Sequence, residues 1–274
     1  MWNDNRVTPD WSRLGSIRPL KEGRVFRLCM TGAHDWVLKR GGNRVGAQVA
    51  AAGMGTIGRL CVQTVPVAVA RIEDDLLPIW SGAAGRGVDC PRPSETWLLM
   101  PYVESVTFRN AREYYCGATG RQRRELYEAI GRLWVFDILI DNSDRLVKGV
   151  NTENVLVSKN LRLYAIDQEL GRPLTGELDH DPNRLRRRLE AIRTTERRAA
   201  LCADLFDEVN RDLLNYRLQD RDAFCHAAGA GLVSGVRNVA LVSEAEIHAC
   251  IGSEAISTLK SVLVEFQRAA MMMC

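Results

Sequence analysis

One stretch of the chain, residues 133–169, carries an apolar helix pattern followed by polar residues and two strand patterns. The strands are separated by Lys159 and Asn160, which favour a turn, so the pattern predicts a β-hairpin. Antiparallel strands return to their starting point. Asn154, directly before the first strand, and Asp167, directly after the second, are therefore expected at the same end of the hairpin, where they could share a metal ion.

The side chains of this stretch match the chemical needs of phosphoryl transfer. The reaction requires one carboxylate beside the acceptor hydroxyl, and an amide oxygen plus a second carboxylate to hold Mg²⁺ against the nucleotide phosphates. Asp144, Asn154 and Asp167 could supply these groups, and Arg145 could stabilise Asp144 or the transferring phosphate. Each motif alone is also typical of turns, in which Asn and Asp cap their own backbone. Their order predicts a kinase-type site with Asp144 as the catalytic carboxylate.

The run FDILIDNSDR, NTENVLV and LYAIDQE resembles the catalytic domain of the actin-fragmin kinase family, and more distantly kinases of the HipA and phosphatidylinositol type. The separation of ten residues between Asp144 and Asn154, longer than in ordinary protein kinases, is a family trait; Val150 departs from the usual Gly. The resemblance implies an α+β, two-lobed protein kinase-like fold, with a small antiparallel-sheet lobe at 1–103 and a mostly helical lobe at 104–274. It also implies a Ser/Thr protein kinase that uses ATP and Mg²⁺, with an actin-like protein as substrate.

Upstream residues provide candidates for nucleotide binding. Lys39 ends a predicted strand and would contact the α- and β-phosphates. Gly23 is the candidate for a turn that covers the phosphates, since it permits close backbone approach. The predicted helix at 43–60 carries no Glu to pair with the lysine, and Gln48 is the best positional match. A glutamine can accept a hydrogen bond but brings no charge. Glu22 is an alternative acid.

The strand pattern at 96–103 is typical of the segment that connects the two lobes of a kinase and binds adenine. With Met100 as the gatekeeper, the carbonyl of Pro101 and the N–H of Val103 would contact the base. Proline keeps its carbonyl and lacks only an N–H that this scheme does not use.

A long helix is predicted at 121–140, with apolar residues at helical spacing, and it ends where the polar loop begins. Asp137 lies among these apolar residues. It could brace the loop through backbone hydrogen bonds, or it could be a carboxylate on the helix surface.

The segment from Arg184 to Arg198 combines seven arginines with an apolar stripe of Leu185, Leu189 and Ile192. This run could dock an acidic protein partner, a phosphate or an anionic membrane, although such runs are more often the solvated face of an amphipathic helix. Further along the chain, Ser243 and Glu246 have the spacing of a capping box, and a last helix is predicted at 253–272.

Composition limits the class of protein. With 274 residues, 46% of them hydrophobic, the chain can bury one large core divided between two lobes. Its formal net charge of +3 is too close to neutral to favour a nucleic acid as partner. No segment reaches the roughly 18 consecutive apolar residues of a membrane span.

The eight cysteines show no C-x-x-C spacing, and the histidines are far apart, so a structural zinc site is not expected; Cys225–His226 is the only adjacent pair. Cysteines without an evident pairing pattern are typical of a reducing compartment, and we expect a cytoplasmic location.

Three functions remain open from the sequence. The first is a protein Ser/Thr kinase. The second is a nucleotide-binding pseudokinase that acts as a scaffold, because Gln48 replaces the helix Glu and no glycine-rich loop is evident. The third is a kinase-fold enzyme that acts on a lipid or small molecule, or transfers AMP, with the run at 184–198 as a headgroup site.

Overall fold

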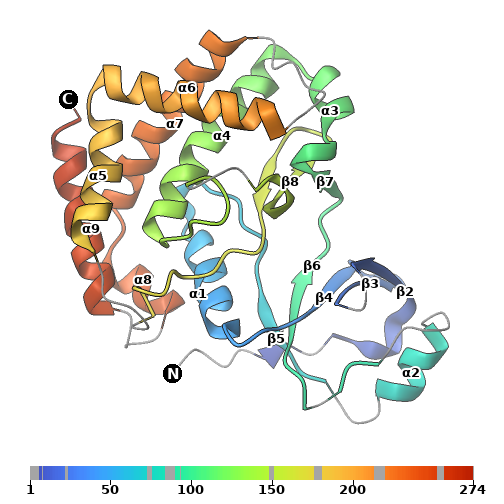
Figure 1. Ribbon diagram of the computed structural model, residues 1–274. Coiled ribbons are helices and arrows are strands. Elements are labelled where there is room, and N and C mark those ends of the chain that lie inside the picture. The colour runs from blue at the N-terminus through green and yellow to red at the C-terminus, as the bar shows by residue number, and fades with distance from the viewer. Residues whose placement is uncertain are drawn as a thin grey trace.

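The computed structural model is of the α+β class, as predicted, and combines two small sheets with a larger group of helices (Figure 1). It describes residues 6–7, 9–21, 24–72, 76–83, 90–92, 94–147, 151–175, 181–212, 220–251 and 256–273.

The larger sheet has the strand order β1-β5-β6-β4-β3-β2. Its strands are β1 (Arg6–Val7), β2 (Leu14–Lys21), β3 (Val25–Met30), β4 (Trp36–Arg40), β5 (Ala68–Ala70) and β6 (Trp97–Pro101). All neighbouring strands are antiparallel except β1 and β5. The strand predicted to end at Lys39 is confirmed as β4, although it continues to Arg40, and it pairs antiparallel with β3. Alternate residues of β3 are buried, as expected for a strand with one face on a core.

The smaller sheet has the order β7-β8-β9, with β7 (Ser105–Thr107), β8 (Val155–Ser158) and β9 (Leu163–Ala165). Strands β8 and β9 form the predicted hairpin, and Lys159 and Asn160 lie in its turn. The chain passes from the larger to the smaller sheet through residues 102–104, directly after β6.

The helices of the described residues make up most of the second half of the chain. They are α1 (Val45–Gly55), α2 (Leu76–Ala83), α3 (Arg112–Cys116), α4 (Gly120–Leu139), α5 (Pro182–Arg193), α6 (Thr195–Asp212), α7 (Arg221–Ala240), α8 (Glu244–Cys250) and α9 (Ile256–Met271), with 3-10 turns η1 (Trp11–Arg13), η2 (Gly58–Leu60), η3 (Phe108–Asn110) and η4 (Thr152–Asn154). Helices α4 and α9 confirm the predictions at 121–140 and 253–272. Ser243 and Glu246 form the predicted capping box of α8, and the predicted apolar stripe of α5 is buried.

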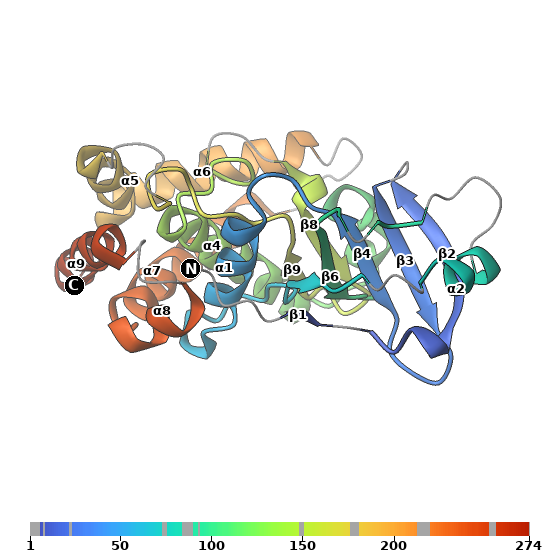
Figure 2. The same cartoon turned by 90° about the horizontal axis from the view of Figure 1, so that it is seen from below.

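Two separate hydrophobic cores hold these elements. The smaller core lies between the larger sheet and α2, where the ring of Phe26 meets Trp80 edge-on at 5.5 Å. The larger core contains residues of the smaller sheet and of the helices other than α2. Helix α1 was predicted to belong with the larger sheet, but its buried residues, among them Ala50 and Met54, pack into the larger core. A boundary at residue 103 therefore does not separate the two cores. Figure 2 shows α1 beside the helices, between them and the sheet.

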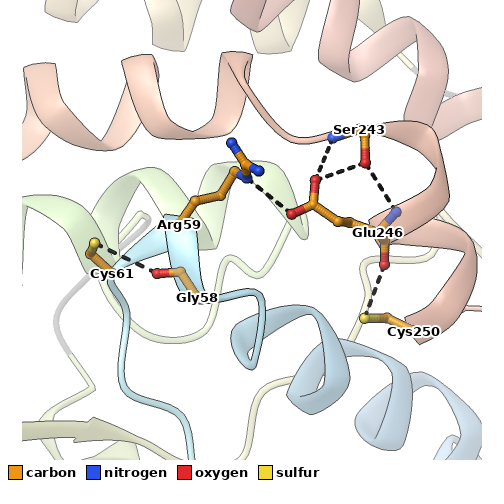
Figure 3. A network of polar contacts seen from close by, with 6 residues as sticks. All are labelled: Gly58, Arg59, Cys61, Ser243, Glu246 and Cys250. Atoms are coloured by element: carbon orange, nitrogen blue, oxygen red, sulfur yellow. Dashed lines mark hydrogen bonds and ion pairs between the residues drawn. The ribbon is translucent and has the colours of Figure 1, made fainter.

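An exposed polar network keeps the segment after α1 close to α8 (Figure 3). Arg59, in η2, donates from Nε to Glu246 Oε1 at 2.9 Å. The other carboxylate oxygen of Glu246 accepts the backbone N–H of Ser243 at 2.8 Å. The Ser243 N–H and hydroxyl, together with Arg59, lower the pKa of Glu246 to about 2. The same carboxylate thus caps α8 and links it to the chain that leaves α1.

Helices α4 and α7 approach each other closely because glycine lies at their contact. A Cβ atom at Gly131 would be 2.2 Å from the carbonyl oxygen of Ala228. A Cβ atom at Gly231 would be 2.1 Å from the carbonyl oxygen of Glu128. Both obstacles are backbone atoms, which cannot turn aside as a flexible side chain can.

We expect Gly131→Ala to destabilise the protein, although alanine is the better helix former by about 1 kcal/mol. The added methyl group must push two backbones apart, and overpacking of this kind costs about 1–3 kcal/mol. The free energy of unfolding in urea measures the effect. Gly120→Ala, in the first turn of the same helix with nothing within 4 Å of the new Cβ, is the matched control and should leave stability unchanged or raised. Equal effects of the two substitutions would contradict the close contact.

Candidate functional site

A cleft of about 590 Å³ lies where the end of the β8–β9 hairpin, the loop after α4 and the start of α1 meet. Five of the residues predicted from the sequence line it: Lys39, Gln48, Asp144, Asn154 and Asp167. The structure thus brings together side chains that are up to 128 positions apart in the chain.

Asp144 is held in place by two neighbouring amide side chains. Its backbone N–H donates to Oδ1 of Asn142 at 3.1 Å, and Asn142 is buried. Its carboxylate oxygen Oδ2 accepts from Nδ2 of Asn154 at 3.3 Å. Because a carboxylate can only accept, the NH₂ group of Asn154 must face Asp144. The Oδ1 atom of Asn154 is therefore directed away from Asp144.

The hairpin brings Asn154 and Asp167 to the same end, as predicted. The backbone N–H of Ile166 donates to the carbonyl oxygen of Asn154 at 3.1 Å, which extends the β8–β9 pairing by one step. Asp167 follows with a φ of 53°, in the left-handed region. This conformation turns the chain sharply at the end of the strand, and the Asp167 carboxylate forms an ion pair with Lys39 of β4.

Helix α1 is linked to the site by Arg44 instead of by Gln48. Among the described residues, no hydrogen bond joins Gln48 to Lys39. Arg44, at the start of α1, donates to Glu169 Oε1 and to the carbonyl oxygen of Leu170, each at 2.7 Å. The backbone N–H of Leu170 in turn donates to the carbonyl oxygen of Ala47 at 3.2 Å. An ion pair between α1 and the segment after Asp167 thus connects the helix to the cleft. The sequence offered only a weak signal for it, an acid two residues after Asp167.

Arg145 does not face the cleft, contrary to the prediction that it could contact the transferring phosphate. Its side chain and that of Asp137 are both 0% exposed. Arg145 Nε donates to the two carboxylate oxygens of Asp137 at 3.1 and 3.2 Å, and Nη1 donates to the carbonyl oxygen of Ile166 at 3.2 Å. Burial raises the pKa of Asp137, and the Arg145 guanidinium opposes this shift. Asp137 therefore does brace the loop, but through the Arg145 side chain instead of through backbone groups.

The residues predicted to bind adenine lie apart from this cleft. Met100 and Pro101 end β6, and Val103 follows in the connection to the smaller sheet. Lys39 of β4 lies opposite Leu98 of β6, so Met100 and Pro101 are further along β6 than the residue that faces Lys39. None of Met100, Pro101 and Val103 lines the cleft. Gly23, together with Glu22 and Val150, lies outside the described residues.

Most arginines of the run from Arg184 to Arg198 are paired within the chain, so the run is not a free basic face. The ion pairs are Arg184 and Arg188 with Asp141, Arg186 with Glu265, Arg187 with Asp181, and Arg193 and Arg197 with Glu190. Arg198 donates to the carbonyl oxygen of Ile192 at 2.9 Å. Only Arg184 of this run also lines the cleft.

A comparison of the chain with models of known protein families gives no match, and a comparison with curated proteins gives none either. Within the described ranges, no helix is both long and apolar enough to cross a membrane.

The donor set of the cleft fits Mg²⁺ better than a transition metal. In the part of the chain that the structure describes, no three His, Cys, Asp or Glu side chains gather as metal ligands, and this includes Cys225 and His226. Mg²⁺ needs no such cage, since it is commonly held by one or two carboxylates together with substrate phosphates and water. Asp167 and the amide oxygen of Asn154 are donors of this kind.

We expect Asp137→Ala to destabilise the protein by about 3–5 kcal/mol, because it leaves the Arg145 guanidinium buried without its carboxylate. Urea unfolding monitored by circular dichroism measures the loss. Asp207→Ala breaks an exposed ion pair with Arg221 and should cost only about 0–1 kcal/mol. If Asp137→Ala were as mild as this control, the buried pair would not have the role described.

Proposed function

We propose that this chain is a protein kinase that uses ATP and Mg²⁺ to phosphorylate a Ser or Thr hydroxyl, and that its two cores correspond to the lobes of a protein kinase-like fold. The observation that carries the proposal is the hydrogen bond between Asp144 and Asn154, beside Asp167, at one end of the hairpin. A carboxylate, an amide and a second carboxylate thus meet in one cleft, with a lysine on the second carboxylate.

The arrangement of the larger sheet supports the same proposal. In protein kinases the lysine that contacts the phosphates lies on the third strand, and a helix follows that positions it. Here β2, β3 and β4 are consecutive antiparallel strands, Lys39 lies on the third, and α1 follows. The connection at 102–104 contains Val103, directly follows Met100 and Pro101 of β6 and joins the two sheets, as the adenine-binding segment of a kinase is expected to do.

In the proposed reaction Asp144 is the general base. Its exposed carboxylate accepts the hydrogen bond of the acceptor hydroxyl and takes the proton as the oxygen bonds to the γ-phosphorus of ATP. The bond from this phosphorus to the β–γ bridging oxygen breaks, and ADP leaves with the bonding electrons. Asn154 Nδ2 orients this carboxylate at 3.3 Å. The buried Arg145 side chain keeps the loop in position without touching the substrate.

Asn154 Oδ1 and the Asp167 carboxylate would hold the magnesium ion. When bound, Mg²⁺ neutralises charge on the nucleotide phosphates. Lys39 contacts the α- and β-phosphates in this proposal. Its ion pair with Asp167 keeps the ammonium at the edge of the phosphate site before nucleotide binds. The Arg44–Glu169 pair takes the structural part that an acid on the helix has in ordinary kinases, because it connects α1 to the segment that carries Asp167.

One observation favours a second candidate, a nucleotide-binding pseudokinase. Lys39 pairs with Asp167, and Gln48 brings no acid that could draw the lysine away. A site in which this ion pair persisted would bind nucleotide without turnover. A lipid headgroup site on α5 has less support than the pseudokinase, because the arginines of α5 are paired with acids of the chain itself.

The decisive experiment incubates the purified protein with Mg²⁺, γ-labelled ATP and a mixture of acceptor proteins that includes actin. We expect label on protein Ser or Thr, and loss of it by about 10²–10⁴-fold in Asp144→Ala, because the general base is removed. Asp167→Ala should also abolish transfer, since it removes the carboxylate ligand.

Glu153→Gln is the matched control. Its carboxylate lines the same cleft but has no part in the proposed reaction, so transfer should remain close to that of the wild type. Unchanged transfer in Asp144→Ala would refute the kinase proposal. Tight binding of Mg-ATP by the wild type with no transfer to any acceptor would select the pseudokinase.

A further inference from the structure

A second, smaller cavity of about 130 Å³ adjoins the cleft and shares Asp141, Pro173 and Arg184 with it. We call it the side pocket. Its inner wall is formed by Arg188 and Leu185 of α5 and by apolar residues of α4 and α9. Helices α5 and α9 pack side by side there, as both views of the molecule show (Figures 1 and 2).

Among the described residues around the side pocket, arginines outnumber acids. Asp141 Oδ1 accepts from Arg188 Nη1 at 2.9 Å, and Arg184 Nη2 lies 3.6 Å from the same oxygen. One carboxylate therefore serves two guanidinium groups. Among the described residues that line the pocket, the other acid is Asp181. It caps α5 through the N–H of Asn183 at 2.9 Å and faces a third arginine, Arg187, at 3.7 Å.

This excess of positive charge is partly removed from water. The Arg188 side chain is only 15% exposed, whereas that of Arg184 is 36% exposed. Burial lowers the pKa of Arg188, and the neighbouring Arg184 lowers it further. A carboxylate or phosphate group that entered the pocket would give Arg184 a partner of its own. Guanidinium groups bind both anions through paired N–H donors.

The pocket is preformed because Asp141 is held rigidly. Its φ is 49°, in the left-handed region, and Gly171 packs directly against it. A Cβ atom at Gly171 would be 2.7 Å from both Cβ and the carbonyl oxygen of Asp141, so only glycine permits this contact. The N–H of Gly171 also donates to the carbonyl oxygen of Ile140 at 2.8 Å. The carboxylate that orients both arginines is thus anchored from two sides.

The position of the side pocket indicates which molecule supplies the anion. Asp141 belongs to the loop that carries Asp144, the proposed general base, and the lysine of the phosphate site is not among the residues that line the pocket. A water molecule occupies about 30 Å³ in the liquid, so the cavity has room for a side-chain carboxylate or phosphate but not for a nucleotide.

We propose that the side pocket is a substrate subsite that receives an anionic side chain, Asp, Glu or phosphoserine, from the polypeptide whose hydroxyl lies at Asp144. The inference rests on the proposed function and defines its substrate class as proteins with negative charge close to the acceptor residue. Arg184 is then a specificity-determining residue that contacts the substrate.

Binding of labelled peptides, measured by fluorescence anisotropy with no nucleotide present, tests the subsite. The peptides carry one Thr, with Glu, phosphoserine, Ala or Lys placed at successive positions around it. We expect the wild type to bind Glu or phosphoserine peptides more tightly than the Ala peptide, and the Glu and phosphoserine arms show which anion is preferred. Arg184→Gln should weaken this binding by about 10-fold or more, as for loss of a hydrogen bond to a charged group.

Two further variants make the test specific. Arg193→Gln, on the same helix but outside both cavities and paired with Glu190, should bind like the wild type. Arg184→Glu should reverse the preference toward Lys peptides. If Arg184→Gln and Arg184→Glu both retained the wild-type order of affinities, the subsite would be refuted.

The peptide-binding assay tests the subsite and the phosphoryl-transfer assay tests the kinase proposal, so either proposal can be refuted without the other. Peptide binding that depends on Arg184, without phosphate transfer by the wild type, supports the subsite and refutes the kinase. Transfer to Glu, Ala and Lys peptides with equal kcat/KM supports the kinase and refutes the subsite.

Discussion

The buried ion pair between Asp137 and Arg145 connects α4, the loop that carries Asp144 and the β8–β9 hairpin. Arg145 reaches α4 through Asp137 and reaches the hairpin through the carbonyl oxygen of Ile166, directly before Asp167. Its own carbonyl oxygen accepts the N–H of Asn151 at 2.8 Å, where the chain enters the hairpin. Since Arg145 follows Asp144 directly, its side chain fixes the backbone at Asp144 relative to the hairpin, and Asn154 then orients the Asp144 carboxylate. Buried pairs of this kind add little net stability, because desolvation offsets attraction, so its contribution is mainly geometric.

The site joins two bodies that have separate hydrophobic cores. Lys39 comes from the larger sheet, whereas Asp167 and α1 belong with the helices, so the Lys39–Asp167 pair spans the two. Helix α1 is held on the helical side by its alanine-rich buried face, by Arg44 and, just beyond it, by Arg59. A movement of the larger sheet relative to the helices would therefore change the position of Lys39 without moving α1 or the carboxylates.

Local patterns predicted much of this arrangement. Alternating apolar residues and a two-residue turn defined the hairpin, and the hairpin alone placed Asn154 near Asp167. Contacts between distant elements could not be predicted in the same way. The burial of Arg145 depends on an acid eight positions earlier, on a helix where periodicity marks only the apolar face. Similarly, the sequence indicates only that Gly131 lowers the helix propensity of α4. The lack of room for a side chain at this position depends on the path of α7, which no local pattern predicts.

In the proposed kinase, Asn154 and Asp167 together form a cation site for a bound nucleotide. Electron paramagnetic resonance of Mn²⁺ measures binding at this site, because the signal of the free ion falls as the metal binds. We predict that the wild type with ATP binds Mn²⁺ more tightly than ATP alone does, and that Asp167→Asn weakens this binding by about 10-fold or more. A wild type that adds nothing to the Mn²⁺ affinity of ATP, or an Asp167→Asn variant that binds equally well, would contradict a cation site at Asn154 and Asp167.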